Sequence, residues 1–571
     1  MSTASTKSRS RKKHRSEAGA PWVNAAELVA PDEFRQSDLT ERTWLISSLT
    51  ILAVGAVLRM YDLNLVPFHH DEGVNGNFLV RLVREGIYHY DPANYHGPTL
   101  YYFSAIVPWT LGFLFGPSAQ NTYGLNTVAA RLVPALFGLA TIWLVLLLRR
   151  RLGTVATLCA AALLAISPGA VYLSRYFIHE TLFVFFALGV VVAGLKYYED
   201  GHPVFLVLTS VSAALMFATK ETAIISALVL VIALVSIHVY LRLRNRFSSR
   251  REKEEKHSRR AGKIDQPPKF LERVGGPRAI VILGLGALAI FLALNVFFYS
   301  SFFTNYPKGV YDAVKTFEFW TKTGRESHVH SLATYAKWLL RQESPLLLLG
   351  SVGAALIVWK PRNSFALFSA FWAFGLLAAY SLIAYKTPWL ALNFIVPLAL
   401  IGGYAVQVIW EKGLRQLRLI MAILVIVIGV SGYQTIDLNF FNYDNDAQYY
   451  VYVYAHTRRE TLNLVDEINR IAERTKQSGQ TGITIVAPDY WPLPWYLRDY
   501  SRVGYHGRMS ASSEPVIIAS ESQGAEVQST FGDRYEQVNS SFNSAGSYPL
   551  RPGVNLLLYG RRDALGTSPW K

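Results

Sequence analysis

The sequence predicts a polytopic α-helical membrane protein that ends in a small α/β domain. Three observations predict this fold class. Half of the 571 residues are hydrophobic (51%), and they lie in long runs that charged residues seldom interrupt. The basic residues behind the formal net charge of +16 gather in short segments beside these runs. After residue 435 the long runs stop, and short apolar segments alternate with helical patterns.

Eleven apolar runs are predicted to be membrane spans, because about 20 apolar residues cross the hydrocarbon as a helix. They cover residues 44–64, 126–148, 153–172, 180–197, 203–219, 222–243, 279–299, 345–359, 364–384, 388–410 and 416–434. If a further run at 100–116 also spanned, the basic junctions would face outward, against the positive-inside rule. We therefore expect it to lie in the outer interface as an amphipathic or re-entrant segment.

This topology divides the chain into a cytoplasmic basic tail at 1–43, a transmembrane domain at 44–435 and an extracytoplasmic α/β domain at 436–571. We expect the first span to be a retained anchor, since no signal-peptide cleavage pattern is evident. A charged cytoplasmic loop at 244–278 is typical of a flexible segment near anionic lipid, which argues against nucleic-acid binding. The single cysteine, Cys159, excludes an intrachain disulfide.

The last 110 residues of the chain have the pattern of alternating helices and buried strands. Helices are expected at 461–477 and 525–532, and strands at 483–488, 515–520 and 554–560. Such alternation predicts a small α/β domain. It contains no glycine-rich phosphate loop at a strand-to-helix turn, so nucleotide binding is not supported.

The stretch FHHDEGVNGNFLV at 68–80 lies in the outer loop at 65–125 and carries two adjacent carboxylates, Asp71 and Glu72. Apolar residues at helical spacing predict a short amphipathic helix that begins near Glu72 or Gly73. The exposed amides of a helix start favour ionised carboxylates. Two interpretations stay open at this point, a helix-capping aspartate or a carboxylate that performs chemistry.

Further polar clusters fall on the same predicted face, together with an outer loop at 300–344. They are SRYFIHE at 174–180, ATKET at 218–222 and AYKTPW at 384–389. Ionisable groups at a membrane boundary often line a cavity, and cations there suit an anionic phosphate. The histidines at 69, 70, 96 and 179 offer metal-ligand atoms, but no HxxxH or HExxH spacing appears. We therefore predict no tightly bound metal, and a loosely bound divalent cation near a phosphate remains an alternative.

The loop with Asp-Glu, a short helix and then HGPTLYY at 96–102 resembles the GT-C superfamily of membrane glycosyltransferases, of the protein O-mannosyltransferase and aminoarabinose-transferase type (family GT39). RYFIHE and TKE stand where that family has related motifs, and the resemblance covers about 44–410. A narrower resemblance, carried by FHHDEGVNG, YKTPWLALN and DYWPLPWYLRDY, is to the flippase-activity-associated membrane proteins related to archaeal N-glycosylation.

This resemblance implies an inverting hexosyl transfer from a polyprenyl-phosphate sugar to an acceptor protein, lipid or glycan at the outer face of the plasma membrane. It implies that Asp71 is the general base and that Glu72 assists it. The residues implied to bind the donor phosphate are Arg175, Arg81, Arg84 and Lys386. Those expected to line the substrate groove are His70, His96, Tyr101, His179, Glu180, Lys220, Glu221 and Trp389.

Two other functions remain as alternatives. A flippase or transport component would bind lipid-linked sugar without cleaving it, although the spans show no row of intramembrane charges of the kind that transporters use for coupling. Alternatively, the membrane part would be only a scaffold for the α/β domain.

Overall fold

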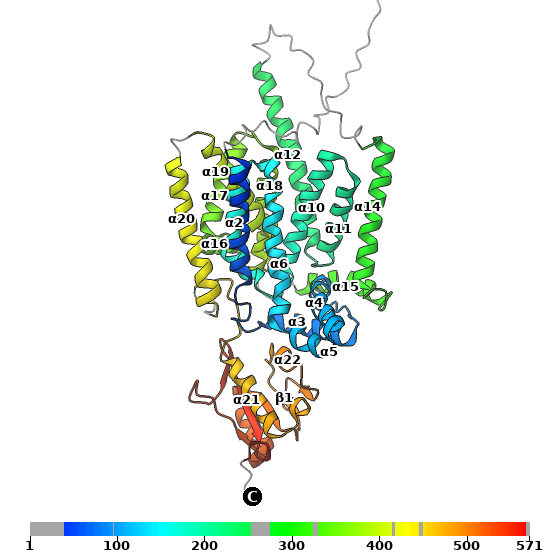
Figure 1. Ribbon diagram of the computed structural model, residues 1–571, viewed down its shortest axis with the longest axis vertical. Coiled ribbons are helices and arrows are strands. Elements are labelled where there is room, and N and C mark those ends of the chain that lie inside the picture. Colours follow the sequence, from blue (N-terminus) through cyan, green and yellow to red (C-terminus); the bar gives the residue numbers. More distant parts are fainter. Residues whose placement is uncertain are drawn as a thin grey trace, which may run out of the picture.

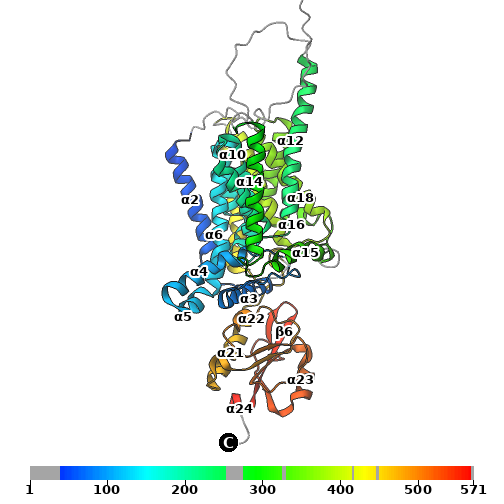
Figure 2. The same ribbon diagram turned by 90° about the vertical axis from the view of Figure 1, so that its right-hand side faces the viewer.

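The structure is a computed structural model that describes residues 39–94, 96–252, 274–323, 329–413, 417–444 and 449–566. The predicted basic tail lies almost entirely outside these residues, and so does most of the predicted loop at 244–278. The described chain forms a bundle of long helices with a smaller domain attached at one end (Figures 1 and 2).

Every one of the eleven predicted spans is helical in the structure. The bundle contains α2 (Glu41–Met60), α6 (Thr127–Leu146), α8 (Thr154–Ala165), α9 (Pro168–Ser174), α10 (Glu180–Asp200), α11 (Pro203–Phe217), α12 (Ala223–Glu252), α14 (Gly276–Tyr299), α16 (Thr334–Gln342), α17 (Ser344–Trp359), α18 (Ser364–Leu382), η2 (Pro388–Ala391), α19 (Leu392–Trp410) and α20 (Leu417–Ile436). Most of them are apolar throughout, as helices are that face either lipid or one another.

The fold class is confirmed, and the number of spans stays a prediction. Among the described residues, eight helices are long and apolar enough to cross a membrane. Two bent pairs, α8 with α9 and α16 with α17, raise the number to ten if each pair is one span. Helix α11 has only 15 residues, although it packs between α10 and α14.

The two bends meet at one buried carboxylate. Helix α9 starts with Pro168, which has no amide hydrogen to continue the ladder of α8, and α17 starts with Ser344–Pro345. Glu343, at the second bend, accepts hydrogen bonds from the Ser167 hydroxyl and the Gly169 amide, both at 2.8 Å. One side chain therefore joins the two breaks and supplies the start of α9 with an acceptor.

Short helices lie at the end of the bundle that faces the smaller domain (Figures 1 and 2). They are α3 (His70–Glu85), α4 (Thr99–Phe115), α5 (Pro117–Ala119), η1 (Gln120–Gly124) and α15 (Lys308–Thr323). Helix α4 corresponds to the run at 100–116 that we predicted not to span. It contains Pro108 and packs against α3.

The C-terminal part is the α/β unit that the sequence predicts. It follows η4 (Asp437–Phe441), and its helices and strands alternate along the chain. The helices are α21 (Thr461–Arg474), η5 (Ser478–Gln480), α22 (Leu493–Tyr496), η6 (Glu521–Gln523), α23 (Gly524–Phe531), η7 (Gly532–Arg534) and α24 (Arg562–Leu565). The strands are β1 (Ile483–Ile485), β2 (Val503–Tyr505), β3 (Val516–Ser520), β4 (Tyr535–Gln537), β5 (Tyr548–Arg551) and β6 (Val554–Arg561).

The six strands form one mixed sheet in the order β2-β1-β3-β6-β4, and β5 pairs with β6. Strand β1 runs parallel to both β2 and β3, whereas β6 is antiparallel to β3, β4 and β5. The amphipathic helix α21 covers a core that includes Ile483, Ile485 and Leu558, each of them completely buried. These apolar strand residues are the reason why the segments were recognisable in the sequence.

Candidate active site

Helix α3 begins two to three residues earlier than predicted, because a histidine caps it. The ring Nδ1 of His69 accepts the Asp71 amide hydrogen at 3.1 Å, and the Glu72 carboxylate accepts the His69 amide hydrogen at 2.9 Å. Together they form a capping box in which an imidazole replaces the usual serine or threonine. Asp71 is thus not the N-cap, so its carboxylate is left available for chemistry.

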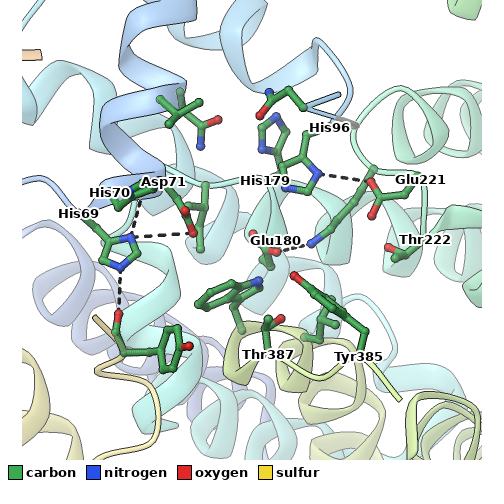
Figure 3. A pocket seen from close by; sticks show the side chains of 18 of the residues that line it. His69, His70, Asp71, His96, His179, Glu180, Glu221, Thr222, Tyr385 and Thr387 are labelled. Carbon is green, nitrogen blue, oxygen red and sulfur yellow. Dashed lines mark hydrogen bonds and ion pairs between the residues drawn. The ribbon is translucent and has the colours of Figure 1, made fainter. Parts of the chain in front are cut away.

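The Asp71 carboxylate stands at the wall of a cavity. Its side chain is 44% exposed, and its Oδ2 lies 3.8 Å from the Nδ1 of His69. Figure 3 shows His69, His70 and Asp71 on one side of the cavity, with His96, Glu221 and Thr222 on the other.

Glu72 lies behind this wall and does not line the cavity. It is completely buried, and Arg131 of α6 donates to both of its oxygens, at 2.7 and 2.5 Å. The Phe177 amide donates to the same carboxylate at 2.7 Å. Such a bidentate, charge-assisted contact is among the strong hydrogen bonds of proteins. Glu72 therefore anchors the start of α3 instead of facing a substrate.

Arg131 also holds the loop that leads into α3. Its guanidinium donates to the carbonyl oxygens of Leu63, Val66 and Pro67 at 2.7 to 3.2 Å. Arg131 lies within the predicted span at 126–148, and no role was predicted for it. Burying an arginine within an apolar run costs free energy unless the guanidinium has partners, so the position of Arg131 in the sequence could have indicated a buried ion pair.

The cavity has a volume of about 710 Å³ and lies between α3, the start of α10, the start of α12 and the segment before α19. Seven of the eight residues that were predicted to line a substrate groove do line it: His70, His96, His179, Glu180, Lys220, Glu221 and Trp389. Asn75, Asn94, Tyr385, Thr387 and Tyr454 join them without having been predicted.

The motif HGPT meets the motif ATKET through backbone contacts. The Gly97 amide donates to the Thr219 carbonyl at 3.0 Å, and His96 forms a bridge with Lys220. A Cβ atom on Gly97 would lie only 2.0 Å from the carbonyl oxygen of Ala218. Only glycine permits this approach, which brings two motifs that are 120 residues apart to one wall of the cavity.

The side chains of these motifs form a charged cluster. The Lys220 ammonium pairs with the Glu180 carboxylate, and His96 Nδ1 lies 3.3 Å from Glu221 Oε2. Burial alone would lower the Lys220 pKa, but the charges of Glu180 and Glu221 outweigh burial and raise it. One ammonium thus faces two carboxylates in this part of the wall.

His179 is neutral at ordinary pH. Burial, together with the nearby His96 and Lys220, lowers its pKa well below the usual value. Its Nε2 lies 3.0 Å from the Gly97 carbonyl oxygen, which can only accept, so Nε2 carries the proton. The ring therefore supports the glycine turn and presents its remaining nitrogen, Nδ1, as an acceptor.

The four basic residues that were predicted to hold a phosphate point elsewhere. Arg175 donates to the carbonyls of Leu58, Tyr61 and Asp62, and its guanidinium stacks on Phe440 at 4.7 Å. Lys386 is almost completely buried and donates to the carbonyls of His330 and Ile383. Neither side chain lines the cavity.

The two arginines of α3 do not line the cavity either. Arg81 is exposed beside Glu85 at 3.5 Å, whereas Arg84 donates to the Arg498 carbonyl and to Asp499 of the C-terminal part. Tyr101, predicted for the groove, is fully buried and donates to Asn75 at 2.9 Å, and so it stands behind a residue that does line the cavity.

The C-terminal part contributes to the site as well. Arg551 of β5 lines the cavity, and the Tyr454 carbonyl lies 2.9 Å from His69 Nε2. The ring of His456 stacks on His69 with 5.6 Å between centroids, and burial lowers the His456 pKa well below its usual value. Nothing in the local sequence around these residues points to Asp71, which lies 383 to 480 residues earlier.

No group of three or more histidine, cysteine or acidic side chains within the described residues is arranged to hold a metal ion. The alternative of a loosely bound divalent cation stays a prediction.

Comparison with known proteins gives a family match and a fold. Residues 119–248 match the family model described as dolichyl-phosphate-mannose-protein mannosyltransferase. No curated protein matches the sequence. The structure resembles ArnT from Cupriavidus metallidurans bound to undecaprenyl phosphate, with a TM-score of 0.58 and 14% identity over 91% of this chain and 98% of that chain.

The oligosaccharyltransferases of Archaeoglobus fulgidus are also similar. One, tethered to an acceptor peptide, gives a TM-score of 0.50 and 15% identity over 81% of this chain and 64% of that chain. Another, AglB in complex with an inhibitory peptide and a dolichol-phosphate, gives 0.50 and 13% over 84% and 69%.

The chain therefore has the fold of the GT-C superfamily of membrane glycosyltransferases, as its motifs predicted. The fold and the family match together support a membrane glycosyltransferase. The narrower resemblance to flippase-activity-associated proteins stays a prediction.

Proposed function

We propose that this protein transfers a sugar from a polyprenyl-phosphate donor to an acceptor nucleophile, with inversion at the anomeric carbon. The observation that carries the proposal is Asp71, a half-exposed carboxylate that is freed from helix capping and stands at the wall of a cavity with ionisable groups on its other side. The structures of two similar proteins, ArnT bound to undecaprenyl phosphate and AglB in complex with a dolichol-phosphate, support this donor class.

In this mechanism Asp71 accepts the proton of the acceptor hydroxyl as the acceptor oxygen bonds to the anomeric carbon. The bond between that carbon and the phosphate oxygen breaks, and the polyprenyl phosphate leaves with the electron pair. Inversion requires the nucleophile and the leaving group to lie on opposite faces of the sugar. The position of Asp71 on one side of the cavity and of His96 on the other supports this arrangement (Figure 3).

The donor phosphate then belongs beside Lys220 and His96, not beside Arg175, Arg81, Arg84 or Lys386. Lys220 lines the cavity and stays charged, and an ammonium stabilises the negative charge that develops on the leaving phosphate. Because Glu180 and Glu221 share this part of the wall, a loosely held divalent cation would complete the charge balance. The predicted topology would put this reaction at the outer face of the plasma membrane.

The test is the variant Asp71→Asn, which keeps the side-chain volume and removes the base. We expect transfer from a polyprenyl-phosphate hexose, measured as released polyprenyl phosphate, to fall about 100-fold or more. Asp200→Asn, at the far end of α10, is the matched control and should keep full activity. Unchanged turnover in folded Asp71→Asn protein would contradict the proposal.

The same measurement separates a transferase from a flippase component. A flippase would bind the lipid-linked sugar and move it between leaflets, but it would release no free polyprenyl phosphate. Vesicles that show donor movement without any such release would therefore support the flippase alternative.

A further inference from the structure

Arg551, the last residue of strand β5 in the C-terminal domain, lies at the candidate active site. The register of β5 against β6 shifts between Pro549 and Arg551, and bulges of this kind turn a side chain to a new direction. The strand is fixed from its other edge, because the Arg458 amide donates to the Leu550 carbonyl and the Thr461 hydroxyl to the Pro549 carbonyl. Arg551 lines the cavity, and its side chain is only 15% exposed.

The domain is seated directly on the helix that carries Asp71. A Cβ atom on Gly73 would lie 2.6 Å from Pro492, and one on Gly76 would lie 2.6 Å from the ring of Trp495. The Trp495 ring in turn stacks on Phe68, with 4.4 Å between centroids. The close contact with the domain thus explains the two glycines of the GVNG motif.

Within the candidate site, Arg551 contacts His70. The Arg551 guanidinium lies 3.2 Å from His70 Nδ1 and pairs on its other side with the Asp489 carboxylate. A guanidinium can only donate hydrogen bonds, so Nδ1 must be the acceptor and is unprotonated. A neutral His70 then carries its proton on Nε2. Among the described residues, no other hydrogen bond of this ring is found, so Nε2–H is available to a ligand.

We propose that Arg551 and Asp489 are positioning residues of the active site, which hold His70 as a neutral Nε2–H donor beside Asp71. The donor serves a hydroxyl or ring oxygen of the bound sugar. The C-terminal domain is then one half of the catalytic centre and not a separate module. The consequence for catalysis rests on the proposed transfer, whereas the state of His70 can be measured without it.

The charges around His70 predict how its pKa should respond when Arg551 or Asp489 is replaced. Burial lowers the His70 pKa most, Asp71 raises it, His69 and Arg551 lower it, and Asp489 raises it. His69 and Asp71 belong to the start of α3, whereas Arg551 and Asp489 belong to the C-terminal domain. Removal of Arg551 takes away a cation and a donor to the neutral ring, so the His70 pKa must rise. Removal of the Asp489 charge must lower it.

The experiment titrates His70 in the full-length protein in detergent by NMR of ¹³Cε1-labelled histidine, with His70→Gln to assign the signal. We expect the midpoint to move up by about half a pH unit or more in Arg551→Gln, down in Asp489→Asn, and back toward wild type in Arg551→Lys. Arg502→Gln is the control and should not move the midpoint, because Arg502 is 55% exposed and pairs with Glu514 elsewhere on the domain.

The transfer assay provides the second readout. If neutral His70 is the active form, the acid limb of the pH profile should follow the same shifts, upward for Arg551→Gln and downward for Asp489→Asn. Shifts of equal sign, or none in either variant, would overturn the positioning role. Opposite NMR shifts in a protein without transfer activity would keep that role and reject the proposed function instead.

Discussion

At the residue scale, the buried ion pair of Arg131 and Glu72 fixes the loop that presents Asp71. Both side chains are at most 2% exposed, and the guanidinium also satisfies three loop carbonyls. A buried pair of this kind adds little compared with apolar residues of equal size. Breaking it is costly, because one uncompensated charge remains inside the protein.

We therefore predict that Arg131→Met lowers the free energy of unfolding by about 3–5 kcal/mol. The double variant Arg131→Met with Glu72→Met should recover part of this loss, since no lone carboxylate is left buried. Chemical denaturation in detergent measures both values. Arg149→Met is the control, because its partner Glu41 is 80% exposed, and it should change stability little. Equal effects at the two arginines would contradict this account.

Single residues also show where sequence reasoning stops. The sequence located the acids, histidines and Lys220 of the cavity, because polar residues between apolar runs are conspicuous. It did not reveal the direction of a side chain. Arg175 and Lys386 are cations in polar segments between apolar runs, yet both side chains donate their hydrogen bonds to backbone carbonyls. That Arg551 lines the cavity is evident only from the folded structure.

At the element scale, the pairing of the HGPT and ATKET segments depends on one glycine. Gly97→Ala would place a methyl group 2.0 Å from the Ala218 carbonyl oxygen, so the two segments must separate and His96 must leave Lys220. We expect transfer activity to fall at least about 10-fold, since displacement of catalytic groups by 1 Å already costs more than that.

The control for this variant is Gly286→Ala in α14, where nothing lies within 4 Å of the added methyl group. Activity there should stay unchanged. If Gly97→Ala is as active as Gly286→Ala, the close approach of the two segments has no part in catalysis.

A second element-scale prediction concerns the glycines on which the C-terminal domain rests. Gly76→Ala adds a methyl group 2.6 Å from the Trp495 ring, so it should loosen the domain from α3 and lower the melting temperature. Hydrogen exchange should then increase in α22 but not in α17. Unchanged exchange in α22 would indicate that the contact tolerates the extra volume.

Elements themselves were the most predictable part of this protein. Most long apolar runs and the three predicted β-rich segments became helices and strands within a few residues of the predicted limits, although α12 continues to Glu252 and the strands β2, β4 and β5 were not predicted. The start of α3 moved because a histidine caps it, which sequence rules for N-caps do not include. Pro168 and Pro345 mark the two bends in the sequence, but the contact between Ser167 and Glu343 joins two distant spans and could not be read from either.

At the scale of the whole molecule, charge sets the orientation and the fold sets which residues share a face. The C-terminal domain and the short helices lie at one end of the bundle (Figure 1), whereas the basic junction near Lys412 follows α19 at its other end. The positive-inside rule assigns that second end to the cytoplasm. The cavity near Asp71 would then open on the extracytoplasmic side, where lipid-linked donors would meet their acceptors.

The single cysteine makes this orientation testable. In a Cys159→Ala background, Ser529→Cys on α23 and Lys412→Cys after α19 each introduce one exposed thiol. We expect a membrane-impermeant maleimide to label Ser529→Cys in intact cells and Lys412→Cys only after the membrane is opened. The reverse pattern would move the C-terminal domain and the Asp71 cavity to the cytoplasmic side. Labelling of both in intact cells would mean that the number of spans between them is even.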